Sequence, residues 1–219
     1  DGDGNTVPSD WMRWNADLAL GWTPDENTWL ELTGGTADGE AMYAGRAMDG
    51  SQFKRESLGL RFEKKNVTDV IKKIEAQVNY NFNDHVMDNF SLRTPPMKHD
   101  HATHEMYLDK SSMQVTRRTV NARMAVTHEW DKIQFITGVD TQNNKHAGGM
   151  VSRSMNMPMK EDMHFNSYGG FGELSYQLSE NNKLVSGVRL DQVKVEDLRQ
   201  DSIAKGFNRE LDKTLASGF

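Results

Sequence analysis

Apolar and polar residues alternate along much of the chain, most clearly near its beginning. Over residues 12–22 one set of alternate positions is mostly large and apolar, while the other set is polar or small. The apolar set is Met12, Trp14, Ala16, Leu18, Leu20 and Trp22. A period of two predicts a β-strand with two different faces. The run exceeds the usual strand of about five or six residues, and it fits the roughly nine to eleven residues of a tilted membrane-spanning strand.

The same alternation recurs further along the chain and predicts eight strands in all. The other seven runs lie near residues 28–33, 57–63, 73–82, 119–127, 133–139, 174–178 and 184–191. Short polar turns follow every odd-numbered strand, and long connections follow the even-numbered ones. The long connections are 36–52, 83–112, 142–164 and a tail from about residue 196. Short turns at one end and long loops at the other predict an all-β fold, an antiparallel up-and-down transmembrane β-barrel.

Composition changes this picture little. A mean hydropathy of −0.74 and 26% charged residues exclude a helical membrane protein, because no stretch of about 18 apolar residues occurs. They do not exclude a barrel, whose strands show only every second residue to lipid. A net charge of −6 without a basic stripe argues against nucleic acid as a partner. The absence of cysteine excludes a thiolate metal site in this stretch.

Methionine and histidine are concentrated in the predicted connections. The chain has 13 methionines and seven histidines, and most of both lie among polar neighbours outside the predicted strands. A methionine that fills a gap in an apolar core is therefore a poor explanation. Thioether sulfur favours Cu(I), and imidazole suits copper, zinc or nickel. The pattern predicts that the chain binds a soft or borderline metal ion, copper and Cu(I) in particular, with no organic cofactor, and no nucleophile–base constellation points to an enzyme.

The principal metal site is predicted at His85-x-Met87. Alternate residues of a strand share one face. If Asn79 and Asn81 face inward and the strand continues, then Asn83, His85 and Met87 face inward as well. Both side chains then point into the barrel near its outer mouth. One imidazole and one thioether are too few for tight binding, so further ligands must come from elsewhere. A lumen-lining pair that holds no metal is the alternative.

Other methionines and histidines are candidates for weaker, transient copper sites. Met155-x-Met157-x-Met159 places three sulfurs on one side of an extended segment, and His99-x-His101 does the same with imidazoles. The full set is Met150, Met155, Met157, Met159, Met163, His99, His101 and His104. The alternative is a group of loops that merely tolerate these residue types.

Two segments carry a resemblance to a known family. Residues 14–24, which read WNADLALGWTP, and residues 81–93, which read NFNDHVMDNFSLR, resemble barrel segments of the TonB-dependent copper receptors of the OprC/NosA type. The likeness covers the whole chain as the middle of the barrel. It implies a plug domain inside a barrel of about 22 strands, so residues 1–219 would be a partial barrel without the plug and the remaining strands. It also implies copper held between a plug Cys-x-x-x-Met element and a barrel His-x-Met element, which His85 and Met87 match.

The resemblance further implies a location and partners. These are the outer membrane of a Gram-negative bacterium and its lipid, the protein's own plug domain, and the TonB–ExbB–ExbD complex, reached through an N-terminal part that this chain lacks. Outer loops would capture copper, and plug movement would release it inward. Three alternatives remain: a ferric-siderophore receptor, a passive porin, and a soluble metal-binding β-protein.

Overall fold

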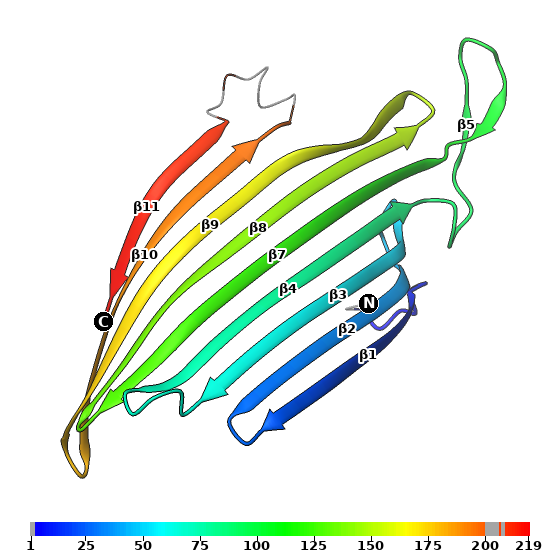
Figure 1. The fold of residues 1–219 in the computed structure, drawn as a ribbon. Helices are drawn as coiled ribbons and strands as arrows, with labels where there is room; N and C mark the ends of the chain where they lie inside the picture. Colours follow the sequence, from blue (N-terminus) through cyan, green and yellow to red (C-terminus); the bar gives the residue numbers. More distant parts are fainter. Residues whose placement is uncertain (1–2, 200–205, 207–208) are drawn as a thin grey trace.

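The computed structural model describes residues 3–199, 206 and 209–219, and its strands form one large curved sheet (Figure 1). Nine strands make up this sheet, in the order β1-β2-β3-β4-β7-β8-β9-β10-β11. Their bounds are β1 Asp10–Asp25, β2 Thr28–Met42, β3 Asp49–Lys65, β4 Ile71–Asp88, β7 Ser111–Trp130, β8 Ile133–Ser152, β9 Met155–Ser179, β10 Asn182–Asp197 and β11 Glu210–Gly218. A separate hairpin pairs β5, Met97–His99, with β6, Met106–Leu108. Among the described residues, no helix is long and apolar enough to cross a membrane.

Every strand of the large sheet pairs antiparallel with its neighbours in the chain, apart from the inserted hairpin. The register aligns apolar residues across strands: Trp22 lies opposite Leu30, and Leu30 lies opposite Phe62. Side chains on one row of the sheet therefore share one face. Strands β1 and β11 form the two edges of the described sheet (Figure 1). The predicted fold class, an all-β antiparallel up-and-down barrel, is confirmed.

The sheet is a single layer, and its apolar face has nothing packed on it. Ala37 and Ala125 are the only buried hydrophobic residues among those described, whereas Leu18 is 64%, Trp22 63% and Val188 70% exposed. Such a face would be unfavourable in water by about 25 cal/mol per Å² of apolar surface. Lipid removes this cost, and the interstrand hydrogen bonds satisfy the backbone as hydrocarbon requires. We therefore call this face the outer face and the opposite one the inner face.

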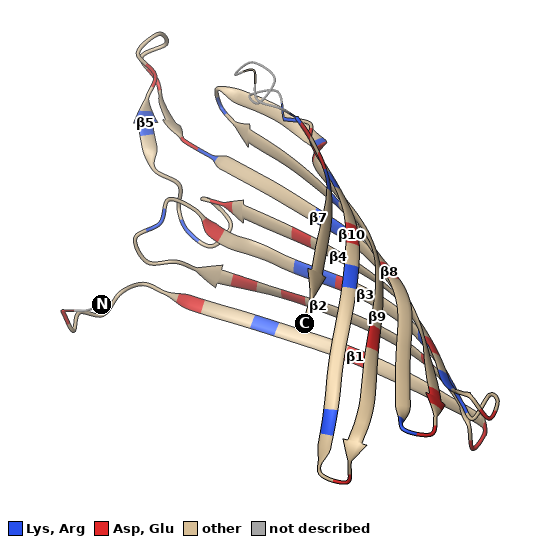
Figure 2. Ribbon diagram, turned by 90° about the vertical axis from the view of Figure 1, so that its left-hand side faces the viewer, with Lys and Arg blue, Asp and Glu red and all other residues tan. Residues whose placement is uncertain are grey.

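Charged residues are spread over the strands and the turns, with both signs interspersed (Figure 2). The inner face is rich in polar side chains, such as Asp17, Asn81 and Asn121, which lie on rows that alternate with the apolar ones. Alternation of apolar-out and polar-in is typical of an outer-membrane barrel. The charge content of the chain is therefore compatible with a membrane wall.

The prediction of eight strands is wrong by one, because β11 lies in the predicted tail and is a ninth strand of the sheet. On β11 the register places Thr214, Ala216 and Gly218 opposite the outer-face residues of β10. These side chains are polar or small, so the strand lacks the large apolar alternation that marks the others. Its pairing with β10, rather than its own pattern, defines it as a strand.

The predicted long connections are shorter than expected. Strands extend into residues 36–52 and 83–112, and 142–164 is almost entirely strand: β8 ends at Ser152, and β9 begins at Met155. The expectation of strict alternation between short turns and long loops is therefore wrong at this hairpin. The outer parts of these strands extend past the apolar band, so their outer-face residues need not be apolar. Their sequence consequently resembles a loop.

Candidate metal centre

The predicted pair, His85 and Met87, lies on β4 near the end that carries the longer connections. The strand continues to Asp88, so the alternation that places Asn83 on the inner face extends to His85 and Met87. On the outer face at the same level, Lys54 pairs with Asp84 in register. These charged neighbours place the His85–Met87 pair beyond the hydrocarbon region of the strand.

The imidazole of His85 has an unused nitrogen. Its ring stacks on Phe53 of β3, with centroids 4.6 Å apart and an interplanar angle of 29°. His85 Nε2 is buried and has no hydrogen-bond partner among the described residues. Buried polar atoms are normally paired, so such an atom needs an explanation. Burial lowers the pKa of His85, while Asp84 opposes the shift. The ring thus favours the neutral form that binds metals.

Gly50 makes room for this stack. It lies opposite Met87 in the register, and a Cβ atom at Gly50 would come within 2.1 Å of Phe53 Cζ. Any side chain at this position would therefore push the Phe53 ring away, and with it the surface on which His85 rests. The absence of a side chain at residue 50 is part of how the imidazole is positioned.

Four methionines lie in one row across neighbouring strands. Met87 of β4 lies opposite Met113 of β7, Met113 lies opposite Met150 of β8, and Met150 lies opposite Met157 of β9. Directly opposed side chains have Cβ atoms about 4.5–5.5 Å apart. The four methionines, which we call the methionine row, are therefore neighbours on the inner face, with Met87 at one end of the row. Met113 was not among the predicted site residues, because the interstrand register cannot be read from a run of residues.

A network of loop contacts holds the outer end of β4 beside β3. The Asp49 carboxylate is fully buried and pairs with the guanidinium of Arg93. Arg93 also donates to the backbone oxygens of Arg46 at 2.6 Å and Tyr43 at 2.9 Å. The Arg93 guanidinium lowers the pKa of Asp49. Asp88, the last residue of β4, accepts hydrogen bonds from Phe90 N–H at 2.9 Å and Ser91 N–H at 2.7 Å. These contacts restrain the strand end that carries Met87.

The structure separates the three methionines of Met155-x-Met157-x-Met159. Met155 lies opposite Ser152 and Met157 opposite Met150, both inner-face positions, but the register then shifts at a β-bulge. The Met159 sulfur would lie 3.0 Å from a Cβ atom on Gly149, which faces outward. A bulge places an extra residue against one partner and changes the facing of the strand. The expectation that all three sulfurs share one side is wrong for Met159.

A second imidazole–thioether pair lies further down the inner face. His146 of β8 lies directly opposite Met163 of β9, and His146 Nδ1 contacts the Asp162 carboxylate. That carboxylate orients the ring through Nδ1 and leaves Nε2 as the nitrogen that could bind a metal. Met163 was predicted as a possible ligand, and the structure adds His146 as its neighbour.

The predicted His99, His101 and His104 lie together at the β5–β6 hairpin, which projects beyond the ends of β4 and β7 (Figure 1). The ring centroids of His99 and His101 are 5.0 Å apart, and those of His99 and His104 are 5.9 Å apart. Within the described residues, no group of three or more His, Asp, Glu or Cys side chains is arranged so that it could hold a metal ion. The histidines are thus neighbours, but they are not a preformed cage.

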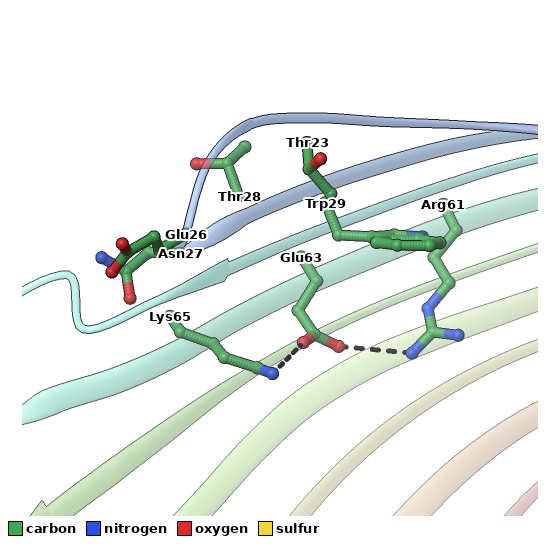
Figure 3. Close-up of a pocket in the computed structure, with 8 residues that line it drawn as sticks. All are labelled: Thr23, Glu26, Asn27, Thr28, Trp29, Arg61, Glu63 and Lys65. Atoms are coloured by element: carbon green, nitrogen blue, oxygen red, sulfur yellow. Dashed lines mark hydrogen bonds and ion pairs between the residues drawn. The ribbon is translucent and has the colours of Figure 1, made fainter.

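A hollow of about 180 Å³ lies at the opposite end of the sheet, next to the turn between β1 and β2 (Figure 3). In it, Glu63 forms ion pairs with Arg61 at 3.2 Å and Lys65 at 3.3 Å. Trp29 also lines this hollow, which has no imidazole or thioether in its wall. The described residues therefore offer soft metal ligands at the His85 end of the sheet but not in this hollow.

A single curved layer of antiparallel strands, apolar outward and polar inward, is typical of the wall of a transmembrane β-barrel. Residues 1–215 match the family model described as TonB dependent receptor-like, beta-barrel. The chain belongs to this family.

Two solved structures are similar to the chain. One is titled "Copper transporter OprC": it is 46% identical, with a TM-score of 0.85, and the match covers 100% of this chain and 36% of that one. The other is BauA, the ferric preacinetobactin receptor from Acinetobacter baumannii, which is 10% identical with a TM-score of 0.69 over 96% of this chain and 37% of that one. The second likeness shows the fold alone. No curated protein matches the chain, which spans about a third of the length of these solved structures.

Proposed function

We propose that this chain is the middle of the barrel of a TonB-dependent copper receptor, and that His85 and Met87 are the barrel half of its copper site. The observation that carries the proposal is the buried, unpartnered Nε2 atom of His85, with a thioether two residues further along the same face. The likeness to the protein titled copper transporter OprC, at 46% identity over the whole chain, supports copper as the cargo.

The chemistry of the pair fits monovalent copper. A neutral imidazole and a thioether are soft or borderline ligands, and Cu(I) accepts both. Two ligands leave the coordination incomplete, so we expect the plug domain to supply the others. The methionine row extends from Met87 towards the outer hairpin of β8 and β9, and weak thioether sites along it would deliver copper to the pair.

Transport then needs partners outside this chain. The receptor would lie in the outer membrane of a Gram-negative bacterium, with lipid against its outer face and its own plug inside the barrel. Plug movement driven through the TonB–ExbB–ExbD complex would release copper inward.

A ferric-siderophore receptor would use the same wall, but it has no need of a methionine row. Bulky iron chelates are better matched by aromatic and arginine side chains at the barrel mouth. A soluble metal-binding protein is disfavoured by the outer face, where residues such as Leu18 and Val188 have no covering layer.

The test is the copper content of the full-length receptor that carries this chain. We expect the purified wild-type protein, loaded with Cu(I), to hold a near-stoichiometric tightly bound copper. His85→Asn/Met87→Leu should lose it, because both changes keep the side-chain size and remove the ligand atoms. The matched control is His128→Asn/Met124→Leu, which changes the same residue types at outer-face positions. Equal copper in both variants would refute the assignment, and heat-modifiable migration on gels reports that each barrel is folded.

A further inference from the structure

The β5–β6 hairpin presents three imidazoles on a short, hydrogen-bonded turn. Asp100 N–H donates to Glu105 O at 2.8 Å, and His104 N–H donates to Asp100 O at 2.8 Å. The Asp100 carboxylate also accepts from the Ala102 N–H at 2.9 Å. His104 has a φ of 57°, a left-handed conformation that is uncommon for a residue other than glycine. The turn thus fixes the backbone from which the three rings project.

An arginine attaches this hairpin to the methionine-rich strands. Arg153, in the turn between β8 and β9, pairs with Asp100 at 2.6 Å. Its guanidinium also lies 4.1 Å from the centroid of the Tyr107 ring on β6. The backbone N–H of Ala102 and the Arg153 guanidinium both lower the pKa of Asp100. The hairpin is therefore held next to the strand ends that carry Met150 and Met157.

The spacing of the rings suits one shared metal ion. A metal–nitrogen bond of about 2.0–2.1 Å places two rings on the same ion with centroids roughly 5 Å apart. The observed separations from His99 are 5.0 Å to His101 and 5.9 Å to His104. The His99–His101 separation matches this value, whereas a shared ion that also binds His104 requires rotation of the side chains. Across the hairpin, Met106 lies opposite His99 and offers a neighbouring thioether.

We propose that His99, His101 and His104 form a three-imidazole site for a divalent transition-metal ion, with Cu(II) preferred. Affinity for nitrogen ligands peaks at Cu(II) among the divalent first-row metals, whereas thioethers select Cu(I). The choice of copper as the cargo rests on the proposed function, but the site itself does not. The receptor then carries two chemically different sites: an imidazole site at the projecting hairpin and a thioether-containing site on the inner face.

Electron paramagnetic resonance of the full-length receptor titrated with Cu(II) ions tests this. We expect one bound Cu(II) whose spectrum shows coupling to several nitrogens. The variant His99→Asn/His101→Asn/His104→Asn should lose this signal, or bind Cu(II) about tenfold or more weakly. His128→Asn, which removes an imidazole at the far end of β7, should leave it unchanged. A triple variant with an unaltered spectrum and affinity would overturn the site.

The double variant His85→Asn/Met87→Leu separates this inference from the proposed function. The hairpin site should keep its Cu(II) spectrum in that variant. If instead the double variant loses the Cu(II) signal and the triple variant keeps it, the hairpin site is wrong, while the inner-face copper site stands. If the triple variant alone loses Cu(II), and the double variant loses no tightly bound copper, the hairpin site stands and the proposed function fails.

Discussion

At the scale of single residues, the sequence predicts that the side chains of His85 and Met87 lie on the inner face of the sheet, because β-strand alternation extends to the end of β4. The partners of these residues could not be predicted. Phe53 is stacked on His85, and Met113 lies opposite Met87, but both contacts depend on the register between strands. A register is fixed by pairing partners and by bulges, such as the shift between Gly50 and Gln52. A single sequence does not reveal it.

Gly50→Ala should weaken copper binding without removing any ligand. The new methyl group would displace the Phe53 ring, so the His85 imidazole would lose the surface that orients it. We expect the affinity of the His85–Met87 site to fall by about tenfold, measured by competition with a Cu(I) chelator. Gly34→Ala is the matched control, because a Cβ atom there meets only Ser57 O, at 4.0 Å. Equal affinities for the two variants would contradict this role for Phe53.

Met113→Leu/Met150→Leu should remove weak sites and leave the tight one. Leucine keeps the volume of methionine, so the fold should change by less than about 1.5 kcal/mol, while the thioethers are lost. We expect fewer weakly bound Ag(I) ions, used as a stable surrogate for Cu(I), with the tightly bound copper retained. Met12→Leu/Met124→Leu changes two outer-face methionines and should not alter the count. Unchanged Ag(I) binding in the first variant would show that the methionine row binds no ion.

At the scale of elements, strands with large apolar residues on one face were predictable, and their outer extensions were not. Within the membrane the outer face must be apolar, so the sequence alternates there. Beyond the membrane this requirement ends, and the ends of β8 and β9 carry glycine, serine and methionine instead. The sequence does not mark β11 as a strand for a related reason, because the residues on its outer face are small or polar. The bulge in β9 that turns Met159 had no marker in the alternation either.

Asp49→Asn should loosen the loops around the outer ends of β3 and β4. It leaves the Arg93 guanidinium without its buried counter-charge, which should lower the free energy of unfolding by about 2–3 kcal/mol. The pKa of Asp49 is lowered from 3.8 by Arg93. Its stabilising contribution is thus complete above pH 3.8 and is lost as the pH falls through the lowered value. Urea unfolding in detergent, at pH 7 and at a series of successively lower pH values, measures both effects.

The control for this change is Asp69→Asn, in an exposed turn at the opposite end of the sheet. It should leave stability nearly unchanged at each pH. If Asp49→Asn unfolds at the wild-type urea concentration at neutral pH, the ion pair with Arg93 contributes nothing to the loops.

At the scale of the whole molecule, one sheet separates a polar inner face from an apolar outer face, and it has almost no hydrophobic core. Interstrand hydrogen bonds satisfy its backbone, and in the proposed receptor the lipid would cover its apolar face. A chain with a mean hydropathy of −0.74 can form part of a membrane-spanning barrel, because only alternate residues of each strand face the hydrocarbon. The same arrangement brings soft ligands from β4, β7, β8 and β9 onto one inner surface.

Val139→Arg distinguishes a membrane wall from a soluble sheet. Val139 is 59% exposed on the outer face, so arginine there would be nearly neutral in water. In a bilayer it should cost about 2–4 kcal/mol, measured by reversible unfolding of the receptor in lipid. Gln142→Arg, at an inner-face position on the same strand, should cost much less. Equal, small effects would contradict the assignment of the outer face to lipid.

The most direct test of the central claim is a crystal structure of the full-length, Cu(I)-loaded receptor with anomalous diffraction recorded at the copper edge. The account predicts an anomalous peak within bonding distance, about 2.0–2.4 Å, of both His85 Nε2 and Met87 Sδ. A strong peak elsewhere, with His85 Nε2 and Met87 Sδ unligated, would contradict it.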